Sequence, residues 1–114
     1  MNELLDLLTE AREYFREHGG AQGVMFKDDG TVCAVGALHR CAYKDRLPIS
    51  LREMATRRLN GAARELYRDK LGGLTPTIFD VNDQWQTDYW PDYNHKAAVL
   101  TCYNKAIEDL ENDA

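Results

Sequence analysis

Apolar residues at helical spacing, interrupted by glycine pairs and a proline, constrain the fold of this chain more than any other feature. Leu4, Leu8, Ala11 and Phe15 recur at the spacing of one helix face, between a plausible N-cap at Asn2 and the pair Gly19-Gly20. This pattern predicts a helix over residues 3–18. The stretch 33–44 predicts a second helix, which ends before Pro48 because proline cannot continue a helix.

Two further helices follow from capping signals. Ser50 stands three residues before Glu53, which is the spacing of a capping box, so we expect a third helix from Ser50 to about Leu71 that ends at the pair Gly72-Gly73. Asn94 or Asp92 is the expected cap of a last helix over residues 95–110. Its predicted inner face is Ala98 or Val99, Cys102, Tyr103, Ala106 and Leu110.

The segment between the first two helices is expected to form a β-hairpin. Val24-Met25-Phe26 and Thr31-Val32 flank the turn sequence Lys27-Asp28-Asp29-Gly30, and Asp-Gly between apolar runs is a strong local hairpin signal. The stretch 74–94 is rich in aromatic and turn residues, and we expect it to be an ordered loop that wraps the core. The predicted fold is a single α+β domain over residues 1–114. It is mostly helical, with about four helices, one short β-hairpin and a long ordered aromatic loop.

The composition is that of a globular domain, with 44% hydrophobic and 29% charged residues. No apolar run is long enough for a transmembrane helix, and the first residues are acidic where a signal peptide is basic, so we expect a cytoplasmic protein that does not contact membranes. The three cysteines are interpreted as reduced thiols. The net charge is −5, although residues 40–70 hold nine Lys and Arg and only four Asp and Glu.

Cys33 stands at the expected start of the second helix and has two interpretations. Cys33, Gly36, Ala37 and Cys41 share one face of that helix, and small residues there let another element pack closely. A thiol at a helix N-terminus is also a candidate nucleophile, because the helix dipole lowers its pKa. The alternative function is therefore a small cysteine-dependent hydrolase, whose nucleophile needs a base and an orienting group. The candidates are His95 or His39 as the base and Asn82 or Asp83 as the orienting residue.

Metal and cofactor sites are not predicted. The chain has no Cys-x-x-Cys, and its three histidines lie far apart at residues 18, 39 and 95.

Two other groups of residues are candidate binding surfaces. Aromatic side chains dominate protein interfaces, and four lie close together in the loop, at Trp85, Tyr89, Trp90 and Tyr93. Arg57, Arg64 and Arg68 share a face of the third helix and form a candidate nucleic-acid surface, since arginine clusters neutralise phosphates. A second interpretation of the same arginines is a solvated helix face that pairs with an acidic stripe on the first helix. The acidic stripe consists of Glu3, Asp6, Glu10, Glu13 and Glu17.

Short motifs resemble an uncharacterised family of small proteins from actinobacteria and their bacteriophages. They are Cys33-x-x-Gly36-Ala37-Leu38 and, later, the pair Asn82-Asp83 before a closing helix. The family commonly has a tryptophan before the Asn-Asp pair, where this chain has Val81. The resemblance implies no known activity, but it implies an actinobacterial or phage source. Small phage proteins outside the virion often act on one host protein, so the leading expectation is a non-enzymatic protein that binds a host protein and modulates its activity.

Overall fold

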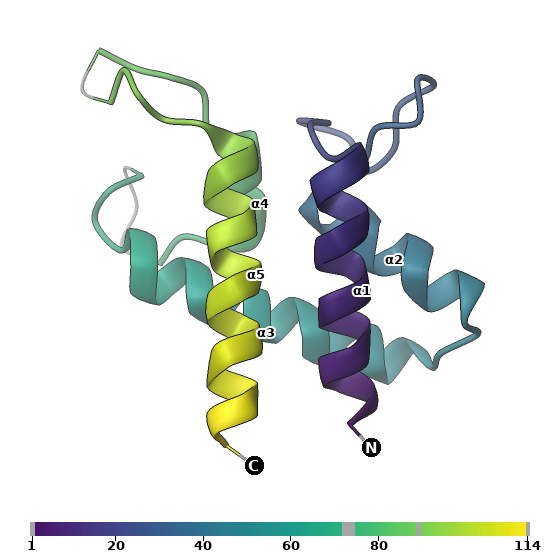
Figure 1. Cartoon of the computed structure of the whole chain (residues 1–114). Coiled ribbons are helices and arrows are strands. Elements are labelled where there is room, and N and C mark those ends of the chain that lie inside the picture. Colours follow the sequence, from purple (N-terminus) through teal and green to yellow (C-terminus); the bar gives the residue numbers. More distant parts are fainter. Residues whose placement is uncertain (1, 72–74, 89, 114) are drawn as a thin grey trace.

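The computed structural model describes residues 2–71, 75–88 and 90–113. These residues form five helices: α1 (Glu3–His18), α2 (Ala34–Lys44), α3 (Ile49–Tyr67), α4 (Ile78–Asp83) and α5 (His95–Asn112). In Figure 1, α1 and α5 lie side by side and run in opposite directions, so that both chain ends lie at the same end of the molecule. The helix α3 crosses behind them, and α2 and α4 lie in the same rear layer (Figure 1).

The prediction of an α+β fold with a β-hairpin is wrong, because the described residues form five helices and no strand. The turn itself is present, with the Gly30 N–H donating to the Lys27 carbonyl at 3.0 Å. Beyond it the segment forms only isolated bridges. Val32 donates its N–H to the His18 carbonyl at 2.9 Å, and its own carbonyl accepts from Gly20 and Ala21. Val32 also forms one antiparallel bridge with Phe26, but Cys33 directly after it is the N-cap of α2, so no ladder extends beyond this bridge.

The bounds of α1 and the cap of α5 are confirmed. The Asn2 side chain accepts from the Leu5 N–H, and the Asn94 side chain accepts from the Ala97 N–H, so Asn94 and not Asp92 caps α5.

The predicted capping box of α3 is wrong, because the helix begins at Ile49 with Pro48 as its N-cap and makes no side-chain cap bond. Proline has a preset φ, which favours a helix start directly after it. The helix also ends at Tyr67, before the expected end at Leu71, and Gly72 and Gly73 lie outside the described residues.

Helix α4 lies within the stretch that the sequence predicts to be an irregular loop. Its start is a capping box, in which the Thr77 hydroxyl accepts from the Asp80 N–H and the Asp80 carboxylate accepts from the Thr77 N–H at 2.7 Å. Six residues are too few to show a helical period, which is why the sequence pattern does not reveal this helix.

The core lies between the two layers. The predicted inner face of α5 is confirmed, since Ala98, Val99, Cys102, Tyr103, Ala106 and Leu110 are all buried. Tyr103 is the largest fully buried side chain, and its hydroxyl donates to the Ala34 carbonyl at 2.7 Å. This bond ties α5 to the first turn of α2.

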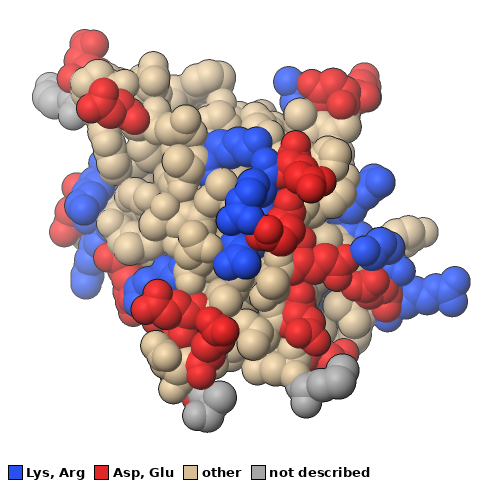
Figure 2. Space-filling view, viewed as in Figure 1, with Lys and Arg blue, Asp and Glu red and all other residues tan. Residues whose placement is uncertain are grey.

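The face formed by α1 and α5 is charged. Figure 2 shows carboxylates along α1 and the lower part of α5, with lysine and arginine side chains between them. Glu13 pairs with Arg12 and Arg16, and Lys105 pairs with Glu65 and Asp109. None of the helices in the described part of the chain is long and apolar enough to cross a membrane.

Candidate functional site

Cys33 lies where the loop after α1 packs against α2. It is the N-cap of α2, is buried, and its Sγ accepts from the Gly36 N–H at 3.3 Å. One turn along, a Cβ added at Gly36 would lie 2.4 Å from the Met25 carbonyl oxygen. Small residues at this end of α2 therefore let the backbone of the loop pass directly over the helix.

Asn82 and Asp83 hold the same junction from α4. The buried Asn82 accepts from the Ala34 N–H at 3.0 Å and donates to the Ala21 carbonyl at 2.9 Å and to Asp83 at 2.8 Å. The Asp83 carboxylate also accepts from the Gly23 N–H at 3.0 Å. These bonds join α4, the loop after α1 and the start of α2.

The structure thus brings three of the hydrolase candidates together, and among the described residues no histidine forms a hydrogen bond with them. Burial, with a smaller contribution from the nearby Asp83 carboxylate, raises the pKa of the Cys33 thiol. Neither His39 nor His95 forms a hydrogen bond to Cys33 in the described residues, and the buried Nε2 of His95 has no partner there. The contacts of Cys33, Asn82 and Asp83 supply a packing role for each, and a protonated thiol is a poor nucleophile.

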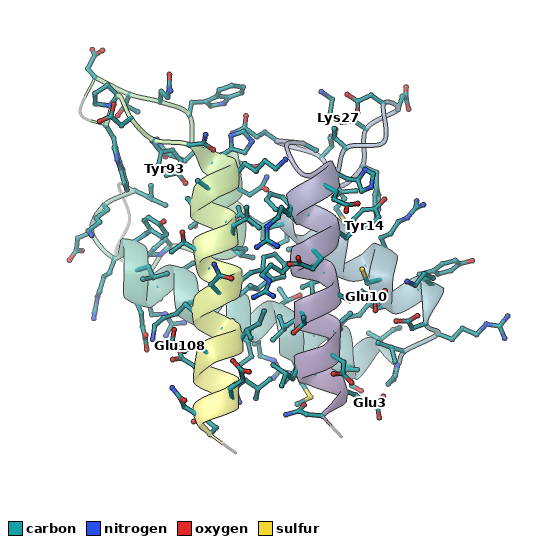
Figure 3. All side chains as sticks on the ribbon, in the orientation of Figure 1. Glu3, Glu10, Tyr14, Lys27, Tyr93 and Glu108 are labelled. Atoms are coloured by element: carbon teal, nitrogen blue, oxygen red, sulfur yellow. The ribbon has the colours of Figure 1, made fainter. Side chains whose placement is uncertain are left out.

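The four aromatic candidates of the loop lie in different environments. Trp85 is 70% exposed. Trp90 is half-buried, with its ring centroid 4.8 Å from that of Tyr93 and 6.0 Å from that of Tyr67. Tyr93, labelled in Figure 3, is buried and donates its hydroxyl to the Val81 carbonyl at 2.5 Å. Tyr89 lies outside the described residues. Trp90 and Tyr93 therefore anchor the loop, and Trp85 is free to meet a partner.

The arginines proposed for nucleic acid are all exposed, Arg57 and Arg64 on α3 and Arg68 directly after its last residue. In the described residues, Arg57, Arg64 and Arg68 form no ion pair, and no cation of α3 pairs with α1. The cation on α3 that does pair is Arg58, with Asp113 at 3.1 Å. Glu10 of the acidic stripe instead pairs with Lys44 of α2. Beside it, the Cζ of Arg40 on α2 lies 5.6 Å from the ring centroid of Tyr14; Glu10 and Tyr14 are labelled in Figure 3.

A surface that the sequence did not predict runs along α2 and α3. Seven large apolar side chains are exposed in the described part of the chain, and five of them line three pockets that share residues. We call these five the apolar face: Val24, Phe26, Tyr43, Ile49 and Phe79. Exposed apolar patches of this kind mark interaction sites in soluble proteins.

Two of the three pockets form one groove between α2 and α3. They have volumes of about 740 and 490 Å³ and share His39 and Arg52. Burial and the nearby Arg52 lower the pKa of His39. We call this the α2–α3 groove; its charged lining residues are Arg40, Lys44, Arg52, Glu53 and Arg57.

One signal in the sequence does point to the groove. Val35, His39 and Tyr43 are spaced four residues apart on α2, on a stripe separate from the small-residue face. Val35 at the start of this stripe is buried, whereas Tyr43 at its end is 86% exposed, so the stripe leads from the core to the surface of the groove.

A match to a protein family places the chain but assigns it no activity. Among the described residues, no group of three or more His, Cys, Asp or Glu side chains is placed to hold a metal ion. No curated protein and no solved structure matches the chain. A family model described as a family of unknown function, DUF6197, matches residues 1–109. The expectation of an uncharacterised family is confirmed, and the chain belongs to this family of unknown function.

Proposed function

We propose that the chain is a non-enzymatic interaction protein that binds another protein through its apolar face and modulates that protein's activity. The observation that carries this proposal is the gathering of Val24, Phe26, Tyr43, Ile49 and Phe79 around adjoining pockets. Large apolar side chains in pockets supply most of the affinity of protein interfaces.

We place this encounter in the cytoplasm, because the three cysteines are free and reduced thiols are typical of that compartment. If the chain comes from a phage, as the resemblance implies, the partner is a host protein. That part of the proposal rests on the resemblance alone.

Matched variants of α3 test the proposal. The tagged chain captures proteins from a bacterial lysate, and bound proteins are identified by mass spectrometry. Ile49→Ser removes a side chain of the apolar face that is 63% exposed, and Met54→Ser removes one that is 45% exposed on the same helix but lines none of these pockets. We expect a protein that the wild type and Met54→Ser retain and that Ile49→Ser and Phe79→Ser lose. The same captured set from all four chains would refute the proposal, and loss from Trp85→Ala alone would move the contact to the loop.

A second candidate is nucleic-acid binding through Arg57, Arg64 and Arg68, which have no carboxylate partner among the described residues. The test is the fluorescence anisotropy of a labelled single-stranded and a labelled duplex oligonucleotide at increasing salt. Binding that weakens steeply with salt and falls in Arg64→Gln, but not in Arg58→Gln, supports this candidate. Arg58 is the matched control because it is engaged with Asp113. Absence of binding at low salt removes the candidate.

A further inference from the structure

The charges of the α2–α3 groove are unlike those of the rest of the chain. The chain has 19 acidic and 14 basic residues, yet Glu53 is the one carboxylate among the described residues that line the groove. Arg52 is central, because it lines both pockets of the groove and a third pocket beside Lys44 and Arg46. The groove is therefore positive on a protein that is negative overall.

The arginines of the groove are also free to bind. In the described residues, Arg40, Arg52 and Arg57 form no ion pair, whereas Arg12, Arg16 and Arg58 on other surfaces all do. Arg40 lies over the Tyr14 ring and lines a further pocket with Glu10, Glu13 and Glu17, although it forms no ion pair with them. The Nε of Arg57 donates to the Glu53 backbone carbonyl at 3.4 Å, which holds its side chain beside the groove. Lys44 differs from them, because Glu10 already neutralises it.

The apolar part of the lining selects the class of ligand. Met25, Val35 and Ile49 form an aliphatic part of the lining, which is suited to aliphatic side chains of a protein partner. They provide contact area for bulky apolar side chains, as do Phe26 and Phe79 beside them. Guanidinium groups at the border of such a surface bind carboxylates with two parallel hydrogen bonds.

We propose that the α2–α3 groove binds an acidic protein segment, whose bulky apolar side chains cover Ile49 and Phe79 and whose carboxylates pair with Arg40, Arg52 and Arg57. This inference rests on the proposed function and names the chemistry of its partner. Helix α2 has 11 residues, so the groove along it is about 16 Å long at the helical rise per residue. That length accommodates about three turns of a helix or about five extended residues.

A peptide selection tests the charge of the partner directly. The wild-type chain is immobilised and enriched against random peptides displayed on phage, and the same selection is repeated with Arg52→Glu. We expect the wild type to enrich peptides with several Asp or Glu around bulky apolar residues. Arg52→Glu is expected to lose their binding by about tenfold or more and to enrich less acidic peptides. Arg64→Glu makes the same charge change on α3 outside the groove and is the matched control.

The outcomes separate this inference from the proposed function. Acidic peptides that Arg52→Glu loses and Arg64→Glu keeps support both. Neutral or basic peptides that Ile49→Ser loses but Arg52→Glu keeps overturn the acidic partner and leave the apolar face as the binding surface. No enriched peptide, or peptides that bind every variant equally, overturns the inference and the proposed function together.

Discussion

The close approach of the loop to α2 predicts that Gly36→Ala destabilises the fold. The new Cβ would lie 2.4 Å from the Met25 carbonyl oxygen and 3.3 Å from the Cβ of Val32. The obstacle is backbone, which has no rotamer to change. The same Met25 carbonyl accepts from the Cys33 N–H at 2.9 Å, so a retreat of the loop also stretches that hydrogen bond.

The expected change in the free energy of unfolding combines three effects. Overpacking a close contact costs about 1–3 kcal/mol. Weakening one hydrogen bond costs about 0.5–1.5 kcal/mol. Alanine gains at most about 1 kcal/mol over glycine in a helix, and less in the first turn, where Gly36 lies. We therefore expect Gly36→Ala to lower the free energy of unfolding by about 1–3 kcal/mol.

Gly61→Ala is the matched control, because Gly61 is interior to α3 and has no atom within 4 Å of its added Cβ. It is expected to raise the free energy of unfolding by about 0.5–1 kcal/mol. Both variants are measured by urea unfolding followed by circular dichroism. If Gly36→Ala is as stable as the wild type or Gly61→Ala, the loop does not pack against the helix backbone as described.

Four more predictions concern the junction, the thiols and the tryptophans. Asn82→Ala leaves the Ala34 N–H and the Ala21 carbonyl unpaired and should cost about 2–4 kcal/mol in urea unfolding, and a cost as small as that of Gln84→Ala would contradict the bonding described. Burial raises the pKa of Cys41 to about 11 and of Cys102 to about 12. The unfolded chain therefore releases these protons at a lower pH than the folded chain, so the free energy of unfolding should fall as the pH rises from about 9 toward 11. Urea unfolding midpoints that do not change over this pH range would refute the prediction. The same thiols should react with Ellman's reagent slowly in the native chain at neutral pH and quickly in urea, and equal rates would show that they are not buried. Iodide should quench the fluorescence of Trp85 strongly and that of Trp90 weakly, so Trp85→Phe should remove most of the quenching. Quenching that is unchanged in Trp85→Phe would show that Trp90, and not Trp85, is the exposed tryptophan.

Helix bounds could be predicted where independent signals agree. For α1, the cap at Asn2, the apolar stripe and the glycine pair all indicate one segment, and its observed bounds match. For α3, Pro48 and Ser50 both indicate a start, and the proline prevails because its backbone is already in the extended conformation of an N-cap. Helix α4 begins with a capping box, but its six residues are too few to show a helical repeat of apolar residues. Its sequence therefore carries a start signal without the apolar pattern that would confirm a helix.

The predicted hairpin does not form a ladder because helix α2 begins directly after its second segment. Asp-Gly predicts the turn at residues 27–30, which is a local property, and the turn is observed. Phe26 and Val32 form one antiparallel bridge, but Cys33 already caps α2, so the pairing stops after that bridge. The backbone groups of Val32 bond to His18, Gly20 and Ala21 at the end of α1. These bonds join segments more than ten residues apart, and no local pattern reports them.

The groove could not be predicted from the sequence for two reasons. The composition and net charge are averages over the whole chain, and large apolar residues in a sequence are usually assigned to the core. The molecule measures 44 × 36 × 19 Å, so it is thin enough that the layer of α2, α3 and α4 keeps an outer side that no other element of the described chain covers. Bulky side chains such as Phe26, Ile49 and Phe79 remain on that side. The net charge of −5 argues against an anionic partner only if charge is evenly spread over the surface. Helix α1, in the other layer, carries five carboxylates, whereas Glu53 is the one carboxylate beside four basic residues among the described residues that line the groove. A sum over the whole chain therefore does not describe the charge of one surface, and the partner of the groove has to be inferred from the residues that line it.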